Sequence, residues 1–370
     1  MKNKNLLKFI TISFFVIFIF SVPIITLFTE DKKISEIENK ILTQLPRISF
    51  ENICNKKFMK NFDEYTSDQF PLRANFIKLK NTYNYIIGQR EFRDIYVGKN
   101  NKLMEKYKFN KESVDKNISN ILNTASYMYE SFNIKSKLMV VPTSIAFYKN
   151  DLPNFYISDN QKDSLDYINN NISNKDYLNF YTPYDILSKN KDKYIYYNTD
   201  HHWTQLGAYL SYLDMFDYKY DNKILFNKVS NDFYGTYYSK ALLPMIKGDS
   251  IYSYSTFNNF KIEVDFDKTY NTLYDNDKLN GKNKYQYFLH GDPAFAIIYG
   301  DKNKSNEVIV FKDSYAHNLL PFLTNNYSKI HVVDPRYYNI DLEDYLNKNP
   351  NITEALFINN IQSFNSTFYK

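Results

Sequence analysis

The densest group of reactive side chains lies in residues 198–207, which read Asn-Thr-Asp-His-His-Trp-Thr-Gln-Leu-Gly. In an extended segment, side chains two residues apart point to the same side. We therefore expect Asp200 and His202 to share one face and His201 to point away. A carboxylate beside an imidazole fixes its tautomer and stabilises its protonated form. This spacing predicts Asp200 as the acid and His202 as the base of a nucleophile–base–acid triad.

The nucleophile candidate is Ser314, which follows the apolar run 307–311 at a predicted strand-to-helix turn. A hydroxyl at such a turn lies at the edge of the sheet, where N–H groups of the next helix can stabilise an oxyanion. The alternative is that Ser314 only caps that helix. Its combination with Asp200 and His202 favours the catalytic role. His317 is near enough in sequence to compete with His202 as the base.

A second set of residues is expected to contact a substrate, with a structural alternative for each. Trp203 is a core residue or pocket wall, or a platform for a sugar. Tyr148 and Arg336 follow predicted strands and could contact a carbonyl or an acidic sugar, or could form structural hydrogen bonds or ion pairs. His201 either hydrogen-bonds a neighbour or packs. The predicted substrate-binding residues are therefore Trp203, Tyr148, Arg336 and His201.

Several other functions are disfavoured. Asp200, His201 and His202 could instead bind a metal ion, but adjacent histidines in a strand point apart and no His-Glu-x-x-His motif occurs, so no metal is expected. With 8 glycines in the chain, no Gly-rich loop of a nucleotide site is present, and no cofactor is expected. The net charge of +5 is spread along the chain without a dense basic block, which argues against a nucleic-acid partner. The single cysteine, Cys54, cannot form an internal disulfide.

The pattern of apolar residues predicts an α/β domain. Continuous apolar runs predict buried strands, and helical periodicity separates several of them, which is typical of a parallel sheet. Sites in such sheets form beyond the carboxyl ends of the strands. The expected strands are 137–141, 194–198, 307–311, 330–333 and 355–358, and the clearest helices are 111–132 and 204–216. Residues from about 218 to 290 are polar and rich in tyrosine, and we expect a β-leaning insertion there.

The N-terminus predicts a membrane anchor. Lysines at positions 2, 4 and 8 precede residues 9–28, which carry no charge and are long enough to cross a bilayer as a helix. An uncleaved anchor is favoured over a cleaved signal peptide, because no small-residue cleavage site ends the run. The basic flank places the rest of the chain outside the cytoplasm. We expect an anchor at 1–30, a mostly helical membrane-proximal region at 31–105 and a catalytic domain at 106–370.

The motifs resemble a known family. Asp-His-His-Trp at 200–203 with Gly207, and Phe-Lys-Asp-Ser-Tyr at 311–315, resemble the bacterial DHHW family and the wider group related to alginate O-acetylation proteins. The resemblance implies an SGNH-hydrolase-like three-layer α/β/α fold with a central parallel sheet. It also implies that Asp200, His202 and Ser314 are acid, base and nucleophile, in an order permuted relative to ordinary SGNH hydrolases. Lys312 precedes Asp313 here, so the Gly-Asp-Ser form is absent.

These observations predict a cell-envelope acyltransferase or esterase that adds or removes acetyl groups on a surface polysaccharide. The resemblance implies a membrane-bound acyltransferase as the partner that supplies the acyl group. The alternative is a catalytically inactive protein of the same fold that binds a glycan or helps assembly in the envelope. Loss of ester hydrolysis in a Ser314→Ala variant, with glycan binding retained, distinguishes the enzyme from a binding protein.

Overall fold

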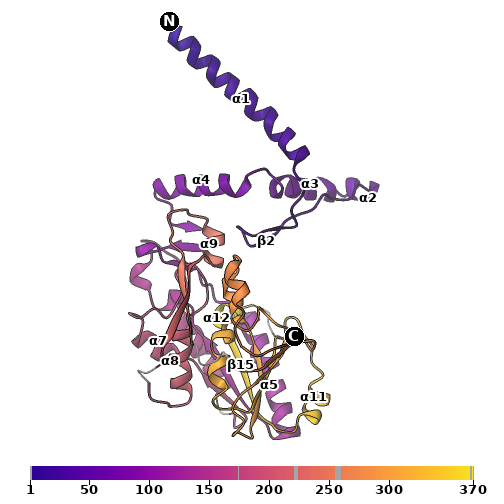
Figure 1. The fold of residues 1–370 in the computed structure, drawn as a ribbon, viewed down its shortest axis with the longest axis vertical. Helices are drawn as coiled ribbons and strands as arrows, with labels where there is room; N and C mark the ends of the chain where they lie inside the picture. Colours follow the sequence, from indigo (N-terminus) through magenta and orange to yellow (C-terminus); the bar gives the residue numbers. More distant parts are fainter. Residues whose placement is uncertain (1, 174, 221–223, 255–259, 367–368, 370) are drawn as a thin grey trace. The chain divides into compact units, whose positions relative to one another are not determined.

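The computed structural model describes residues 2–173, 175–220, 224–254, 260–366 and 369 (Figure 1). The chain divides into two compact units, one of Met1–Gln89 with Ser239–Met245 and one of Arg90–Tyr238 with Ile246–Lys370. The division lies earlier than the boundary at 105/106 expected from the sequence. The reason is that a small antiparallel sheet packs Tyr96 and Met104 into the core of the larger unit. Its strands are β3 (Glu91–Phe92), β4 (Ile95–Val97) and β5 (Leu103–Glu105).

An eight-stranded sheet forms the centre of the larger unit, in the order β11-β10-β12-β14-β13-β15-β6-β7. The five strands β14, β13, β15, β6 and β7 are parallel to one another. β12 pairs antiparallel with β14, β10 with β12, and β11 with β10. This confirms the expected α/β class with a mostly parallel sheet. The strands are β6 (Lys135–Val141), β7 (Leu178–Tyr181), β10 (Ile262–Val264), β11 (Lys268–Tyr270), β12 (Phe295–Tyr299), β13 (Glu307–Lys312), β14 (Lys329–Val333) and β15 (Ile352–Asn360).

Two expectations about the strands differ from the structure. The predicted strand at 194–198 is wrong: the segment folds back on itself through the single bridge between Tyr196 and Trp203. The segment from 218 to 290 is not wholly separate from the sheet, because it supplies β10 and β11 to one edge. It also forms a two-stranded ribbon of β8 (Phe226–Phe233) and β9 (Asp249–Tyr254).

Alternate residues of the sheet enter two separate cores, as expected for a sheet covered on both faces. In β13, Val308 and Val310 belong to one core, and Ile309 and Phe311 belong to the other. The first core is covered by α8 (Gln205–Met215) and α10 (Leu320–Leu323). The second is covered by α5 (Lys111–Phe132), α6 (Gln161–Ile172), α11 (Leu342–Lys348) and α12 (Ile361–Phe364) (Figure 1). These three layers are those of the expected SGNH-hydrolase-like fold.

The two helices predicted from periodicity are present. α5 buries Val114, Ile118, Ile121, Ala125 and Met128 on one side, and the side chain of Asn110 accepts a hydrogen bond from Ser113 N at its start. α8 begins after Thr204, whose side chain accepts from Gly207 N. Such caps satisfy N–H groups that lack a partner inside the helix. The described part of the larger unit also contains the short helix α7 (Tyr184–Lys189).

The smaller unit is mostly helical. Within its first helix, residues Asn5–Thr26 are apolar, entirely unburied and long enough to cross a membrane. A junction follows in which Asp68 accepts hydrogen bonds from the backbone and hydroxyl of Thr43, and Arg73 donates to Glu38. Its elements are α1 (Lys2–Phe28), β1 (Ile34–Ser35), β2 (Lys40–Ile41), α2 (Phe50–Cys54), α3 (Lys57–Asp68) and α4 (Arg73–Ile86).

Candidate active site

The loop that carries Asp200 and His202 is held by a buried carboxylate. Asp249 accepts hydrogen bonds from the backbone N–H groups of Asn198 and Thr199 at 2.9 and 2.7 Å, and from the Thr199 hydroxyl at 2.6 Å. The Tyr194 hydroxyl also donates to it at 2.7 Å. Burial raises the pKa of Asp249, although these donors oppose the shift. These hydrogen bonds therefore fix the loop at Asn198 and Thr199, directly before Asp200.

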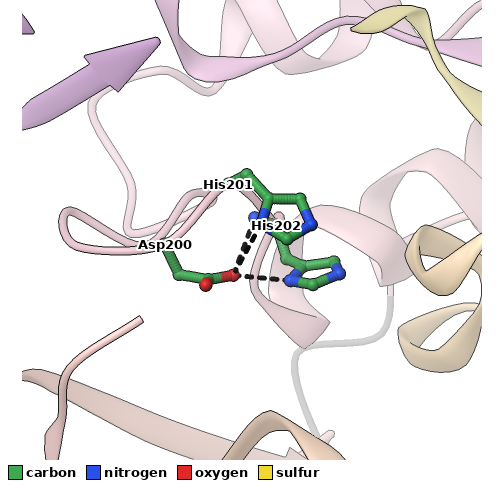
Figure 2. Close-up of side chains that lie close together, drawn as sticks. All are labelled: Asp200, His201 and His202. Carbon is green, nitrogen blue, oxygen red and sulfur yellow. Dashed lines mark hydrogen bonds and ion pairs between the residues drawn. The ribbon is translucent and has the colours of Figure 1, made fainter. Parts of the chain in front are cut away.

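Asp200 and His202 face each other at close range. Nδ1 of His202 lies 2.5 Å from Oδ1 of Asp200, which also accepts from the His202 backbone N–H at 3.0 Å (Figure 2). Oδ2 of Asp200 accepts from the backbone N–H of Thr236 at 2.8 Å. Burial alone would raise the pKa of Asp200, but the imidazoles of His201 and His202 and these hydrogen bonds outweigh it, and the pKa lies below its ordinary range. Asp200 is therefore an ionised acceptor.

The opposite edge of the same imidazole meets Ser314. Nε2 of His202 lies 2.8 Å from Oγ of Ser314. Because the ionised Asp200 can only accept, Nδ1 of His202 carries the ring proton and Nε2 accepts from the serine hydroxyl. Asp200, His202 and Ser314 thus form one continuous chain of hydrogen bonds, from three side chains that lie at two distant positions in the sequence. This arrangement has the geometry that a serine nucleophile requires.

The turn that presents Ser314 is built by the preceding aspartate. Asp313 accepts from the backbone N–H of Tyr315 at 2.9 Å through Oδ1. Its Oδ2 accepts from the backbone and side-chain nitrogens of Asn360, at 2.8 and 2.7 Å, at the end of β15. Asp313 thus ties the carboxyl ends of two neighbouring parallel strands together. Burial raises the pKa of Asp313, against the lowering effect of these donors.

The His202 ring is packed between two other rings. Tyr285 stacks on it with the ring centroids 3.6 Å apart and the planes 9° apart, and His201 lies on it at 3.7 Å. The Tyr285 hydroxyl also donates to the carbonyl of Ser314 at 3.0 Å. Tyr285 therefore holds both the base and the backbone of the candidate nucleophile.

The expected orientation of His201 is wrong. The segment is a tight loop rather than an extended strand, so His201 does not point away: its Nδ1 lies 3.7 Å from Oδ1 of Asp200 and 2.7 Å from Oγ1 of Thr236. Burial, with the nearby His202, lowers the pKa of His201 to about 4. The ring is therefore neutral near pH 7, and its packing and hydrogen bond support the structural alternative.

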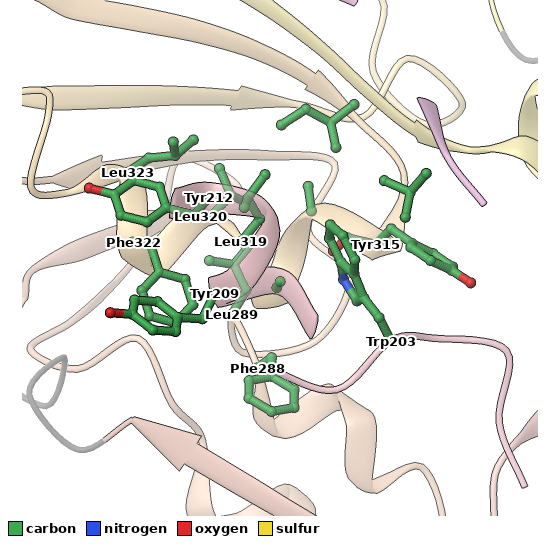
Figure 3. Packing of buried hydrophobic residues seen from close by; sticks show 14 of the residues in the cluster. Trp203, Tyr209, Tyr212, Phe288, Leu289, Tyr315, Leu319, Leu320, Phe322 and Leu323 are labelled. Carbon is green, nitrogen blue, oxygen red and sulfur yellow. The ribbon is translucent and has the colours of Figure 1, made fainter. Parts of the chain in front are cut away.

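Of the other expected substrate contacts, Trp203 lies behind the site. Its indole is fully buried and donates from Nε1 to the carbonyl of Tyr315 at 2.9 Å (Figure 3). A side chain without exposed surface cannot be a platform for a sugar, so the expectation that Trp203 contacts a substrate is corrected to a core role. Tyr148 is half-buried and carries Lys102 Nζ 3.1 Å from its ring centroid.

Arg336 belongs to a charged cluster at the ends of β13 and β14. It donates to Asp334 at 2.6 and 2.8 Å and to Asp292 at 3.4 Å. The fully buried Lys312 donates to the same two carboxylates, at 2.8 Å to Asp292 and 3.1 Å to Asp334. Arg336 therefore makes the ion pairs of its structural alternative. Lys312, which replaces the expected glycine, has these acidic partners to accept its charge.

His317 does not compete with His202 for Ser314. Its Nε2 lies 3.0 Å from Lys312 Nζ and 3.2 Å from Oδ1 of Asp292. Burial and the charge of Lys312 lower the pKa of His317 to about 4. The ring belongs to the charged cluster, and the alternative base expected from sequence proximity is not supported.

Asp200, His201 and His202 also form the cluster considered as a metal site, with ligand atoms within 4.8 Å of one another. These three side chains could bind a metal ion only by giving up hydrogen bonds that they make in the structure. Both ring nitrogens of His202 are engaged, one by Asp200 and one by Ser314, and Nδ1 of His201 contacts Thr236. A metal ion here would replace at least one of these hydrogen bonds.

Three residues of the site were missed by the sequence analysis: Asp249, Thr236 and Tyr285. All lie in the segment that was expected to be an insertion. No short motif marks them, because each acts through a contact with a residue far away in the chain. The only local hint was the high tyrosine content of the segment, which does not single out one tyrosine.

Comparison with known proteins places this geometry in a family. The sequence profile described as "DHHW protein" matches residues 91–333, which is more than half of the chain. The chain belongs to the DHHW family. The matched range of this DHHW protein includes Asp200, His202 and Ser314, and the expected family membership is confirmed. A search of curated protein sequences found no match.

Two of the solved proteins similar to this DHHW protein share its fold with TM-scores above 0.5. A DHHW family protein from Eubacterium siraeum has 23% identity and a TM-score of 0.62 over 73% of this chain and 91% of its own. Bacillus cereus PatB1, also solved with a sulfonyl adduct, has 16% identity and a TM-score of 0.59 over 75% of this chain and 98% of its own. The O-acetyltransferase domain of Pseudomonas putida AlgJ is similar over 73% of this chain and 92% of its own, with 12% identity and a TM-score of 0.44.

Proposed function

We propose that this DHHW protein is a serine-dependent acyltransferase or esterase whose nucleophile, base and acid are Ser314, His202 and Asp200. The observation that carries the proposal is the His202 ring, hydrogen-bonded to Asp200 at one nitrogen and 2.8 Å from Ser314 Oγ at the other. His202 is 4% and Asp200 2% exposed, so this pair is shielded from water, which strengthens the interaction between charge and imidazole.

The proposed reaction proceeds in two balanced steps. Ser314 Oγ attacks the carbonyl carbon of an ester while its proton moves to Nε2 of His202, and Asp200 stabilises the resulting imidazolium. The proton then passes to the leaving alkoxide, and an acyl-enzyme forms at Ser314. A second hydroxyl or a water molecule gives its proton to Nε2 of His202 and attacks the acyl carbon; the bond from that carbon to Ser314 Oγ breaks, and His202 returns the proton to Oγ. Transfer and hydrolysis differ only in that second nucleophile.

The proposed oxyanion donor is the backbone N–H of Ser314. Among the described residues it has no hydrogen-bond acceptor, whereas the next N–H, that of Tyr315, donates to Asp313. An N–H at the start of a helical turn points toward an oxygen that develops beside the serine. The nearby Asp313 supports this role by fixing the turn in one conformation.

We further propose that the acyl acceptor or donor is a hydroxyl-bearing glycan of the cell surface and that the larger unit lies outside the cytoplasm. The support is the apolar span Asn5–Thr26, with lysines at positions 2 and 4 before it and Lys8 near its start, which favours a single-pass anchor with its N-terminus inside. Membership of the DHHW family and the resemblance to alginate O-acetylation proteins support the glycan. A membrane-bound acyltransferase is the proposed source of the acyl group.

Chemical labelling tests the triad. We expect an aryl sulfonyl fluoride to modify Ser314 in the full-length protein, as found by mass spectrometry of the peptide, and to abolish release of acetate from p-nitrophenyl acetate. Ser314→Ala should lose both the label and the activity, and His202→Ala should lose at least about 10³-fold in rate. PatB1, solved with a sulfonyl adduct, supports the choice of probe.

A matched control is Ser119→Ala, which removes an exposed hydroxyl on α5 and should leave label and activity unchanged. Acetate release that persists in Ser314→Ala would contradict the proposal. A folded protein that binds glycan but takes no label and hydrolyses no ester would instead be the binding protein considered as the alternative.

A further inference from the structure

One side of α4 presents an apolar stripe that the smaller unit does not cover. The side chains at positions 76, 79, 83 and 86 are apolar or aromatic and follow a 3-4-3 spacing, which places them on one face of a helix. Their exposed fractions lie between 42% and 74%, far above those of core residues. They are Phe76, Leu79, Tyr83 and Ile86.

The other side of α4 holds the helix to its own unit. Ala74, Ile77 and Asn81 are half-buried, and the side chain of Asn81 donates to the carbonyl of Ala241 at 2.7 Å. The interior of the unit thus uses the face opposite to the stripe. A monomeric protein rarely leaves such a continuous apolar surface in water, so the stripe calls for a partner.

The stripe continues into the surface of the apolar N-terminal helix. The ring of Phe76 in the stripe lies 6.3 Å from the ring of Phe18, in an edge-on contact. Phe18 is within the apolar span Asn5–Thr26, in which no residue is buried. The lipid that would surround Phe18 is therefore in reach of the first turn of α4. Besides Arg73, which is paired with Glu38 inside the unit, the helix carries Lys78 and Lys80 and no acidic residue, which suits the anionic headgroup region of a bilayer.

We propose that α4 lies along the surface of the membrane that α1 crosses, with its apolar stripe inserted at the boundary between headgroups and acyl chains. Helices with one apolar face and basic residues on the other bind membranes in this manner. The inference rests on the proposed anchoring by α1. A lipid surface is preferred over a second protein copy as the occupant because the stripe meets the lipid-facing side of α1 at Phe18 and Phe76.

Spin labels on the full-length protein in vesicles of phosphatidylcholine with a minor fraction of phosphatidylglycerol test this placement. Cys54 is the only cysteine, so Cys54→Ser gives a cysteine-free background. Nitroxides are then attached at Leu79→Cys and Tyr83→Cys. We expect their collision rate with oxygen to rise and that with a water-soluble nickel complex to fall, each severalfold, relative to Lys348→Cys. Lys348 is an exposed position of α11 in the larger unit.

Phe14→Cys, an exposed position of the apolar span, separates the two proposals. If Phe14 reports lipid but Leu79 and Tyr83 report water, or shielding from both reagents by protein, the placement of α4 is overturned and the anchor stands. If Phe14 itself reports water, the anchor fails and the placement of α4 fails with it. Spin–spin broadening at Leu79 would show a second copy on the stripe and would also overturn the proposal.

Discussion

At the scale of single residues, the site depends on how closely His202 is confined. One ring edge meets Asp200, the other meets Ser314, and the two faces carry Tyr285 and His201. An imidazole held on all these sides cannot rotate away from the serine hydroxyl. Tyr285 is the only one of the four neighbours that also bonds to the backbone of the Ser314 turn. It is therefore a positioning residue and not a group that takes part in bond formation.

Substitution of Tyr285 separates its two contacts. Tyr285→Phe keeps the stacked ring and removes the 3.0 Å hydrogen bond to the Ser314 carbonyl, so we expect kcat for p-nitrophenyl acetate to fall by about two- to tenfold. Tyr285→Leu removes both contacts and should lower kcat further, while KM changes little. Steady-state kinetics of both variants measure this. Equal losses of kcat in the two variants would show that the stacked ring has no role.

The proposed triad could be selected from the sequence because its members carry reactive groups in recognisable local patterns. Asp200 and His202 are separated by one residue, and Ser314 follows a continuous apolar strand. Tyr285 and Asp249 could not be predicted, since tyrosines and aspartates are frequent in the same segment and only tertiary contacts distinguish these two. The predicted orientation of His201 was wrong for a related reason. The rule that side chains two residues apart share a face applies to strands, and the backbone here is a loop.

At the scale of elements, two turns decide where the reacting groups lie. The turn after β13 is set by Asp313, which bridges to Asn360 of β15. The position of the loop 198–204 is fixed by its hydrogen bonds to Asp249 and by its close contact with the backbone at Gly235. A Cβ atom at Gly235 would lie 2.2 Å from Cβ of Asp200, which is closer than such atoms approach in proteins. Only glycine permits this approach.

Gly235→Ala should therefore displace Asp200 without removing any functional side chain. We expect acetate release to fall about a hundredfold, because a shift of the acid by about 1 Å misaligns His202. Gly281→Ala is the matched control, since its added Cβ would meet its nearest neighbour at 3.7 Å. Activity and the fluorescence of the single Trp203 report function and fold separately. Unchanged activity in Gly235→Ala would mean that Asp200 is not held by this contact.

Four of the eight strands of the main sheet could be predicted, because buried parallel strands are continuous apolar runs. The runs that became β6, β13, β14 and β15 are of this kind. The strands β10 and β11 are short edge strands with polar neighbours, and their sequences do not differ enough from loops to be distinguished. The run 194–198 is apolar but folds back through a loop fixed by Asp249, which is a contact that no local pattern encodes.

At the scale of the whole molecule, two histidines that are neutral in the folded chain link stability to pH. The pKa values of His201 and His317 are about 4 in the folded chain, against an ordinary value of about 6.5. Between these values the unfolded chain binds more protons than the folded chain. The contribution of these two histidines to the free energy of unfolding is therefore complete above pH 6.5. It decreases as the pH falls toward 4, by on the order of 3 kcal/mol for each histidine.

His317→Gln should reduce this dependence. We expect the variant to lose less stability than the wild type between pH 6.5 and 4.5, although it is less stable at pH 7 because its partners Lys312 and Asp292 lose a contact. Urea unfolding followed by Trp203 fluorescence at a series of pH values measures the difference. Parallel curves for the two proteins would show that the titration of His317 does not contribute.

The short connection between α4 and β3 limits how far from α4 the proposed chemistry can take place. Only Ile87, Gly88, Gln89 and Arg90 separate these elements, and four extended residues reach at most about 14 Å. If α4 rests on the bilayer, the first residue of the larger unit lies within that distance of the membrane-bound helix. If the proposed function also holds, glycan hydroxyl groups would gain or lose acyl groups close to the membrane surface rather than farther out in the envelope.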